Sequence, residues 1–311
     1  MSGAPPVVDL YSRSVEQFLA IVDQVPDGAW VAPTPCADWD VRSLVNHVVG
    51  EDRWVVPLLE GRTIADVGDA LDGDLLGESP ADAAVSAGKS AVAALAEPGA
   101  TARTVHLSFG DFTAEEYAWQ VLADHVVHTW DLAVAIGVSR ELEPRLVEVT
   151  TGWWDAWEDA YRDAGAVGPV VAVPQSASRQ DRLVASFGRD PSWTPVNDVV
   201  RRFGEAWEAW DLDVIMALMA DDAVFESTGP APDGRRVEGA AAIREEWSEM
   251  FRSTRDAVFA FEEAFVNGDR ATARWRFSWT NDDGSAGHVR GADVIRVRDG
   301  LVAEKLSYVK G

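Results

Sequence analysis

Asp124 and His128 are the first two side chains whose type and spacing suggest chemistry. They stand four residues apart in a stretch, 113–137, where apolar residues recur every three or four positions, a pattern that predicts a helix. Thr113 and Glu116 form a capping box at its start. Residues four apart lie on one helical face, so the carboxylate and the imidazole point toward the same region. A third ligand there would complete a metal site.

His47 is the candidate third ligand, because it lies on the apolar side of a second predicted helix, residues 41–59, and would point inward in a bundle. Two imidazoles and one carboxylate suit zinc, nickel or iron and leave coordination positions open for water or substrate. Zinc is the first expectation. Glu51, one helical turn after His47, is a fourth ligand, a general base or simply a solvated helix charge.

Several residues near these candidate ligands are expected to have structural roles. His125 forms a competing i,i+3 pair with His128, and we place it outside the ligand set, either supporting the ligands or on the surface. Trp130 is expected in the core, and Asp131 is expected to pair with Arg42 or a backbone amide. Cys36 is expected to be a structural loop thiol without a basic neighbour.

The elements that must position these residues divide into two kinds. Apolar spacing predicts helices at 7–25, 41–59, 81–97, 113–137 and 141–164, with a short helix near 181–190. Helices joined by loops long enough to cross over favour an all-α four-helix bundle over residues 1–193. Residues 194–311 change to two helices followed by alternating strands at 271–280, 288–297 and 301–309, which predicts an α+β domain with an antiparallel sheet.

Asp293 is the candidate acid or base of the second domain. Strand alternation puts it on the face of Val289, Ile295 and Val297. If that apolar face lines a cavity, desolvation would raise the pKa of this carboxyl. The alternative is that Asp293 pairs with an arginine or tyrosine in a structural network. The cavity lining is expected to be aromatic, from Trp207, Phe225, Trp247, Trp275, Phe277, Trp279 and Tyr308.

Composition limits the partners. The net charge of −25 disfavours nucleic acid and anionic membranes. One cysteine excludes an internal disulfide and a cysteine-rich zinc site and fits a reducing cytoplasm. The sequence has no signal peptide, no apolar run that would span a membrane, no phosphate-binding glycine loop, no nucleophile elbow and no dinucleotide motif.

The segments PTPCADWDVRSLVNHVVGEDRW and LADHVVHTWDLAVAIG resemble the DinB-like metal-binding bundles of the mycothiol-dependent maleylpyruvate isomerase N-terminal type, over about residues 5–193. The resemblance implies metal ligands at His47, Asp124 and His128, and a low-molecular-weight thiol such as mycothiol. The isomerase has glutamate where this chain has Asp124, and it also uses a C-terminal domain of a different kind. The isomerase activity is therefore not carried over.

Residues 196–311 resemble SnoaL-like members of the nuclear transport factor 2-like superfamily, through VRRFGEAWEAWDLDVIMALMADDAVFE and ADVIRVRDGLVAEKLSYVKG. That resemblance implies an α+β cone with a pocket and a homodimer through its sheet. Three functions stay open: metal-dependent isomerisation, thiol transfer or hydrolysis of a small molecule in the bundle; cyclase, isomerase or hydrolase chemistry or ligand binding in the cone; or non-catalytic binding of a small molecule.

Overall fold

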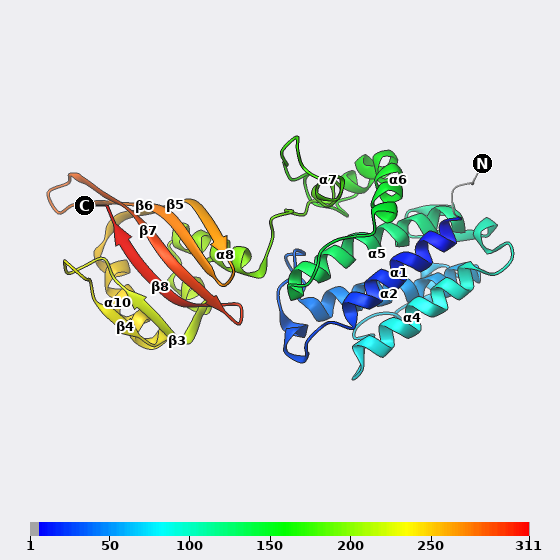
Figure 1. Cartoon of the computed structure of the whole chain (residues 1–311), viewed down its shortest axis with the longest axis horizontal. Coiled ribbons are helices and arrows are strands. Elements are labelled where there is room, and N and C mark those ends of the chain that lie inside the picture. Colours follow the sequence, from blue (N-terminus) through cyan, green and yellow to red (C-terminus); the bar gives the residue numbers. More distant parts are fainter. Residues whose placement is uncertain (1–5, 311) are drawn as a thin grey trace. The chain divides into compact units, whose positions relative to one another are not determined.

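The computed structural model describes residues 6–310, so residues 1–5 and 311 of the predicted domains lie outside the described part. The chain divides into two compact units, Met1–Trp193 and Thr194–Gly311. The first is helical, and the second combines helices with a six-stranded sheet. An N-terminal helical region followed by a sheet-and-helix domain is the predicted fold class (Figure 1).

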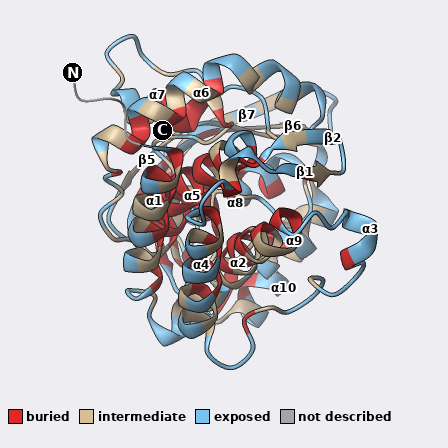
Figure 2. Cartoon of the chain, turned by 90° about the vertical axis from the view of Figure 1, so that its right-hand side faces the viewer, coloured by how far each residue is buried: buried red, intermediate tan, exposed pale blue. Residues whose placement is uncertain are grey.

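The first unit is built on four long helices: α1 (Val7–Val22), α2 (Val41–Leu59), α4 (Pro80–Leu95) and α5 (Ala114–Ile136). α2 packs against α4 and α5, and α1 also packs against α4 and α5, as in a four-helix bundle. Figure 2 shows buried residues along these helices. Their apolar side chains form the core because each helix turns one apolar stripe inward.

α5 is the central helix and carries buried residues along almost its whole length. The predicted capping box is present, since the Thr113 hydroxyl accepts from the Glu116 backbone N–H and the Glu116 carboxylate accepts from the Thr113 backbone N–H. Gly137 ends the helix in the left-handed conformation at φ 73°. α2 likewise begins where predicted, because Asp40 accepts a hydrogen bond from the Ser43 backbone N–H.

Shorter elements connect and extend the bundle. One helical turn, α3 (Ile64–Val67), lies between α2 and α4, and a hairpin of β1 (Thr104–Leu107) and β2 (Gly110–Thr113) precedes α5. The remaining elements of the unit are two 3-10 turns, η1 (Asp27–Val31) and η2 (Ala100–Ala102), and the helices α6 (Pro144–Asp163) and α7 (Arg179–Ser186). α6 packs on α5, and α7 packs on α6.

The second unit contains α8 (Pro195–Glu208), α9 (Leu212–Ala217) and α10 (Ala240–Ser253). Its strands are β3 (Met219–Glu226), β4 (Arg236–Glu238), β5 (Arg255–Asn267), β6 (Arg270–Thr280), β7 (Ala286–Arg298) and β8 (Leu301–Val309). The sheet order is β4-β3-β8-β7-β6-β5. α8 packs across β5 to β8, and α10 packs on β3 and β4, so the helices cover one sheet face.

The expected order of helices first and antiparallel strands afterwards is wrong in one respect. β3 and β4 come before α10, and β3 pairs in parallel with β8. Alternation does not reveal β3, because the consecutive Asp221 and Asp222 interrupt it. Register shifts within β5 break its alternation in the same way. β6, β7 and β8 were predicted to within two residues of their observed ends.

Within the described part of the chain, no helix combines the length and the apolarity needed to cross a membrane.

Two helix glycines provide a matched test of packing inside the bundle. A Cβ at Gly88 of α4 would lie 2.6 Å from Val15 Cγ1, whereas a Cβ at Gly152 of α6 would meet nothing within 4 Å. We expect Gly88→Ala to lower the free energy of unfolding by about 1–3 kcal/mol through overpacking. Gly152→Ala should raise it by about 0.5–1 kcal/mol through helix propensity.

Urea unfolding followed by far-ultraviolet circular dichroism measures both changes. Stabilisation by Gly88→Ala would contradict the close approach of α1 and α4.

Candidate metal centre

The three predicted ligands lie together between α2 and α5. Asp124 Oδ1 is 3.3 Å from His47 Nε2 and 3.3 Å from His128 Nε2. The two imidazole rings meet edge to face with centroids 5.0 Å apart. All three ligand atoms lie within 4.8 Å of one another, so each could contact a single cation placed among them. The helical spacing of Asp124 and His128 produces this convergence.

Asp124 keeps one oxygen unused. Its Oδ2 is buried and has no hydrogen-bond partner among the described residues. Burial alone would raise the pKa of Asp124, but the His128 and His47 rings hold that pKa well below its ordinary value. Burial alone would lower the pKa of His128, and the Asp124 carboxylate instead raises it well above the usual range. A carboxylate held ionised with a spare buried oxygen is suited to a cation.

His128 is oriented from behind by Asp131. Its Nδ1 lies 3.0 Å from Asp131 Oδ2, so Nδ1–H donates to that carboxylate and the ring is held with Nε2 directed toward Asp124. Carboxylates in this position fix the tautomer of metal-binding histidines. Asp131 is fully buried and is held in turn by Arg189, whose Nη2 lies 3.0 Å from Oδ2. The predicted pairing of Asp131 with Arg42 is wrong, since Arg42 pairs with Asp74.

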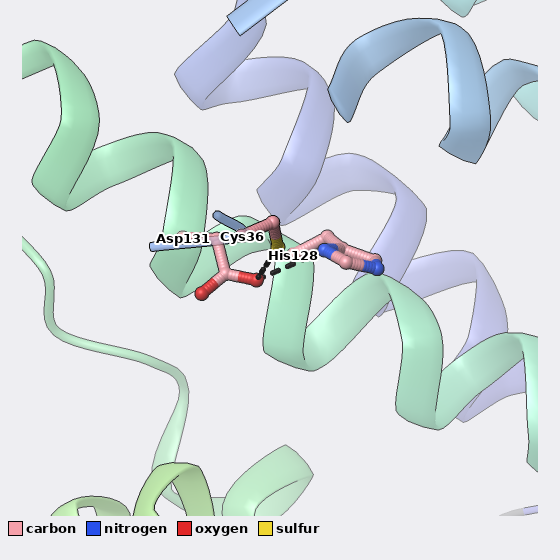
Figure 3. Close-up of side chains that lie close together, drawn as sticks. All are labelled: Cys36, His128 and Asp131. Atoms are coloured by element: carbon pink, nitrogen blue, oxygen red, sulfur yellow. Dashed lines mark hydrogen bonds and ion pairs between the residues drawn. The ribbon is translucent and has the colours of Figure 1, made fainter. Parts of the chain in front are cut away.

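Cys36 has a basic neighbour, contrary to the prediction. Its Sγ lies 3.3 Å from Arg189 Nη2 and 3.4 Å from Asp131 Oδ2. Figure 3 shows the thiol and the His128 ring meeting the same Asp131 oxygen. The prediction failed because Arg189 follows α7, 153 positions along the chain from Cys36, and only the fold brings them together. Cys36, His128 and Asp131 form a second group whose ligand atoms lie within 4.8 Å of one another.

Glu51 lies on the same side of α2 as His47 and lines the same cavity. Burial and the nearby Asp124 carboxylate together raise the pKa of Glu51 to about 7, against the opposing effect of His47 and His128. A carboxyl with a pKa near neutrality can exchange a proton at physiological pH, as a general acid or base must. Of the three interpretations of Glu51, the solvated helix charge is wrong, because the side chain is partly buried and lines the cavity.

A cavity of about 790 Å³ in the second unit and one of about 700 Å³ in the first match the sizes of small-molecule sites. In the bundle, the three candidate ligands and Glu51 line the cavity together with the aromatic side chains Trp39, Phe109, Tyr117, Trp153, Trp154, Tyr161 and Phe187. The Trp39 ring lies over His47, with centroids 4.7 Å apart. The candidate centre therefore opens onto space for a substrate.

His125 is not a surface residue, and its side chain pairs with Asp52 rather than with a candidate ligand. It is fully buried, and its Nε2 lies 2.8 Å from Asp52 Oδ1. The Tyr11 hydroxyl donates to the same carboxylate oxygen, and the Tyr11 ring meets His125 edge to face. This histidine therefore joins α1, α2 and α5 as part of the bundle core.

The second predicted site has the expected aromatic walls. Six of the seven predicted residues line the larger cavity: Trp207, Phe225, Trp247, Trp275, Phe277 and Trp279. The prediction for Tyr308 is wrong, because this residue does not line the cavity and is 57% exposed. Lys305 and Ser307 of the same strand line the cavity. Because side chains alternate between the two faces of a strand, Tyr308 lies on the opposite face of β8.

Asp293 is buried as predicted, but it is not among the residues that line the cavity. Its Oδ2 pairs with Lys305 Nζ at 2.9 Å, and its Oδ1 accepts from the Ser307 hydroxyl at 2.7 Å. The structural network foreseen as the alternative is therefore present, with a lysine in place of the expected arginine or tyrosine. The cavity meets Lys305 and Ser307 rather than the carboxylate.

Sequence reasoning missed three site residues. Arg189 lies in the segment DRLVASFGRDP, residues 181–191, which falls within the range of the first resemblance, and this segment is a signal that could have found it. Trp39 precedes the cap of α2 and belongs to the W-D-V-R block of the same resemblance. The alternation of β8 places Lys305 on the same face as Ser307, but lysine is so rarely buried that alternation alone would not have assigned it to a cavity wall.

The bundle, its His/Asp/His cluster and the sheet-containing second unit define a DinB-like helical protein fused to a SnoaL-like domain. Family models agree. Residues 11–133 match the mycothiol maleylpyruvate isomerase N-terminal domain, and residues 200–305 match the SnoaL-like domain. The chain belongs to the mycothiol maleylpyruvate isomerase N-terminal family through its first unit and carries a SnoaL-like domain in its second.

Individual relatives cover one unit at a time. Uncharacterized proteins from two strains of Mycobacterium tuberculosis are 30% identical over 140 residues, which are 44% of this chain and 70% of theirs. An NTF2-like protein of unknown function from Mesorhizobium loti is 39% identical and has a TM-score of 0.33, with 38% of this chain and 92% of that chain covered. A Mycobacterium tuberculosis protein solved with estradiol-17beta-hemisuccinate is 24% identical, with a TM-score of 0.33 and coverage of 37% and 94%.

Glu51 predicts a pH dependence of bundle stability in the metal-free protein. Its ordinary pKa of 4.5 rises to about 7 on folding, so its favourable contribution is complete below about pH 4.5 and is lost as the pH rises through about 7. The Glu51→Gln side chain cannot ionise, so the stability of this variant should not fall as the pH rises through about 7. We expect the variant to exceed the wild type by about 1–3 kcal/mol near pH 8, with a smaller difference near pH 5.

Thermal unfolding after chelation measures the difference, because a bound cation would itself favour the ionised carboxylate. Glu115→Gln, an exposed position on α5, is the matched control and should show no such trend. A stability difference between Glu51→Gln and the wild type that stays constant across this pH range would refute the assignment.

Proposed function

We propose that the first unit is a metal-dependent enzyme that acts on a small molecule, with His47, Asp124 and His128 as the metal ligands. The observation that carries this proposal is the convergence of His47 Nε2, Asp124 Oδ1 and His128 Nε2 within 4.8 Å on the wall of a cavity of about 700 Å³. A structural histidine cluster would not need an adjoining cavity of this size.

The donor set fits a divalent ion. Two neutral imidazole nitrogens and one carboxylate are a combination found around zinc, nickel and iron. The spare buried oxygen of Asp124 lacks a partner, which is costly unless a cation or water satisfies it. The bond from His128 Nδ1 to Asp131 supplies the support that metal-binding histidines ordinarily have. Zinc is the preferred assignment, with nickel and iron as alternatives.

A bound divalent ion would polarise a substrate oxygen and lower the pKa of a water or thiol in contact with it. The remaining chemistry belongs to the protein. Glu51, with its pKa near 7, can take a proton from the substrate or return one. The buried hydroxyls of Tyr117 and Tyr161 line the cavity and have no partner among the described residues, so they are free to orient a polar substrate group. Trp39 limits the access of water to His47.

Three reaction classes suit these groups: isomerisation, thiol transfer and hydrolysis. Membership in a family named for a mycothiol-dependent isomerase supports a low-molecular-weight thiol such as mycothiol as cosubstrate. The cavity provides an array of aromatic rings, which suit an apolar body, and a metal held by the three ligands would take an oxygen or thiol group. Small keto acids and thiols are therefore the first compounds to screen.

Metal content tests the proposal directly. Purified wild-type protein should carry near-stoichiometric zinc, nickel or iron by elemental analysis. His47→Ala combined with His128→Ala should lose the metal, because a single carboxylate binds these ions weakly. His106→Ala, which removes a histidine paired with Asp111 on the β1–β2 hairpin, is the matched control and should retain it.

The proposal fails if the wild-type protein contains none of these metals and cannot be loaded with any of them. It also fails if the double variant binds metal as well as the control does.

A further inference from the structure

Lys305 is a buried cation at the wall of a cavity whose surface is mainly apolar and includes seven aromatic side chains. Its residue exposure is 6%, and it lines the cavity of about 790 Å³ in the second unit. The nitrogen lies 5.5 Å from the Trp207 ring centroid and 5.3 Å from that of Phe225. Lysine is rarely buried to this extent, and the cost of removing its charge from water requires partners.

Two partners hold the ammonium group. Nζ pairs with Asp293 Oδ2 at 2.9 Å and donates to Ser307 Oγ at 2.7 Å. An ammonium group has three N–H donors, so one remains after these two bonds. Lys305 and Ser307 line the cavity and Asp293 does not. The lysine of the Lys305–Asp293 ion pair therefore lies on the cavity wall, and one N–H of its ammonium group is still available as a donor.

Further donors on the cavity wall also lack acceptors. The indole Nε1 atoms of Trp207 and Trp275 are buried and have no hydrogen-bond partner among the described residues. Both tryptophans are more than nine-tenths buried, and both line the cavity. Unsatisfied buried donors are uncommon and call for a partner. The complementary ligand is one that brings acceptors.

The acidic side chains of the cavity are balanced or lie in water. Glu246 pairs with Arg235, whose side chain is 63% exposed, and Glu249 pairs with Arg252. Asp282 is exposed. Solvent screens such groups, whereas Lys305 acts in a water-poor, aromatic environment where charge interactions are stronger. The polar character of the interior is therefore set by donors.

We propose that this cavity binds a flat, mainly apolar ligand through an anionic oxygen, a carboxylate, phenolate or enolate, that accepts the remaining proton donor of Lys305. The aromatic side chains receive the ring system of the ligand, and the Trp207 and Trp275 indoles supply additional donors. Lys305 is the residue that determines specificity for the anion. This site is separate from the metal centre proposed for the first unit and does not depend on it.

A pair of probes that differ only in charge tests the proposal. 2-Naphthoate and 2-naphthamide share a flat ring system, and isothermal titration of the full chain gives both dissociation constants. A chelator in the buffer prevents carboxylate binding to any metal in the first unit. We expect naphthoate to bind roughly tenfold or more tightly than naphthamide, the range of a charge-assisted hydrogen bond. The net charge of −25 would oppose this preference, so it must arise locally.

The double variant Lys305→Met, Asp293→Asn removes both charges and keeps an acceptor for Ser307. Its preference for naphthoate should disappear while naphthamide binds as before, which also shows that the cavity is intact. Lys310→Met, an exposed position just beyond β8, is the matched control and should keep the wild-type preference. Equal affinities in the wild type, no binding of either probe, or an unchanged preference in the double variant would overturn the proposal.

Discussion

A charge buried inside a helical bundle has to be neutralised by its neighbours, because the water that would solvate it is excluded. In the first unit this requirement falls on Asp131, which is fully buried near the end of α5. Arg189 and His128 neutralise it, and the Cys36 thiol completes its surroundings. The carboxylate thereby joins three segments that are far apart in the sequence: the loop before α2, the middle of α5 and the segment after α7. One consequence is chemical, since the same bond fixes the His128 ring with its Nε2 directed toward Asp124.

Comparison with other buried carboxylates separates structural groups from candidate functional ones. The Asp52 carboxylate forms hydrogen bonds with the Tyr11 hydroxyl and the His125 ring. The Asp293 carboxylate pairs with Lys305 and accepts a hydrogen bond from the Ser307 hydroxyl. These groups are satisfied within the protein and leave little capacity for a ligand. Asp124 differs, because one of its oxygens is buried and unpartnered while the other is shared by two imidazoles at the wall of a cavity. Incomplete satisfaction beside open space is what distinguishes a binding site from a stabilising network.

The local rules of sequence determined what could be predicted. The i,i+4 spacing of Asp124 and His128, the Thr113 capping box and the parity of β6 and β7 all depend on residues close in sequence, and all describe the structure correctly. Arg189 and Lys305 could not be assigned in this way, because their partners lie far along the chain or on another strand. The parallel pairing of β3 with β8 has the same origin, since no local pattern encodes the partner of a strand. Tyr308 was misplaced because the loose alternation of its strand left the face undecided.

The two cavities hold different sets of unpartnered polar groups, and neither set can be read from the overall charge. In the bundle, the Asp124 carboxylate and Glu51 supply acceptors, and the unpartnered Oδ2 of Asp124 is suited to a cation. In the SnoaL-like domain, Lys305 and the unpartnered indoles of Trp207 and Trp275 supply donors, which are suited to an anionic oxygen. The net charge of −25 acts over distances that salt screens, whereas buried donors and acceptors act at contact in a medium of low dielectric constant. The ligand proposed for each unit is therefore the one that would satisfy the hydrogen-bonding groups left unpartnered at the proposed site.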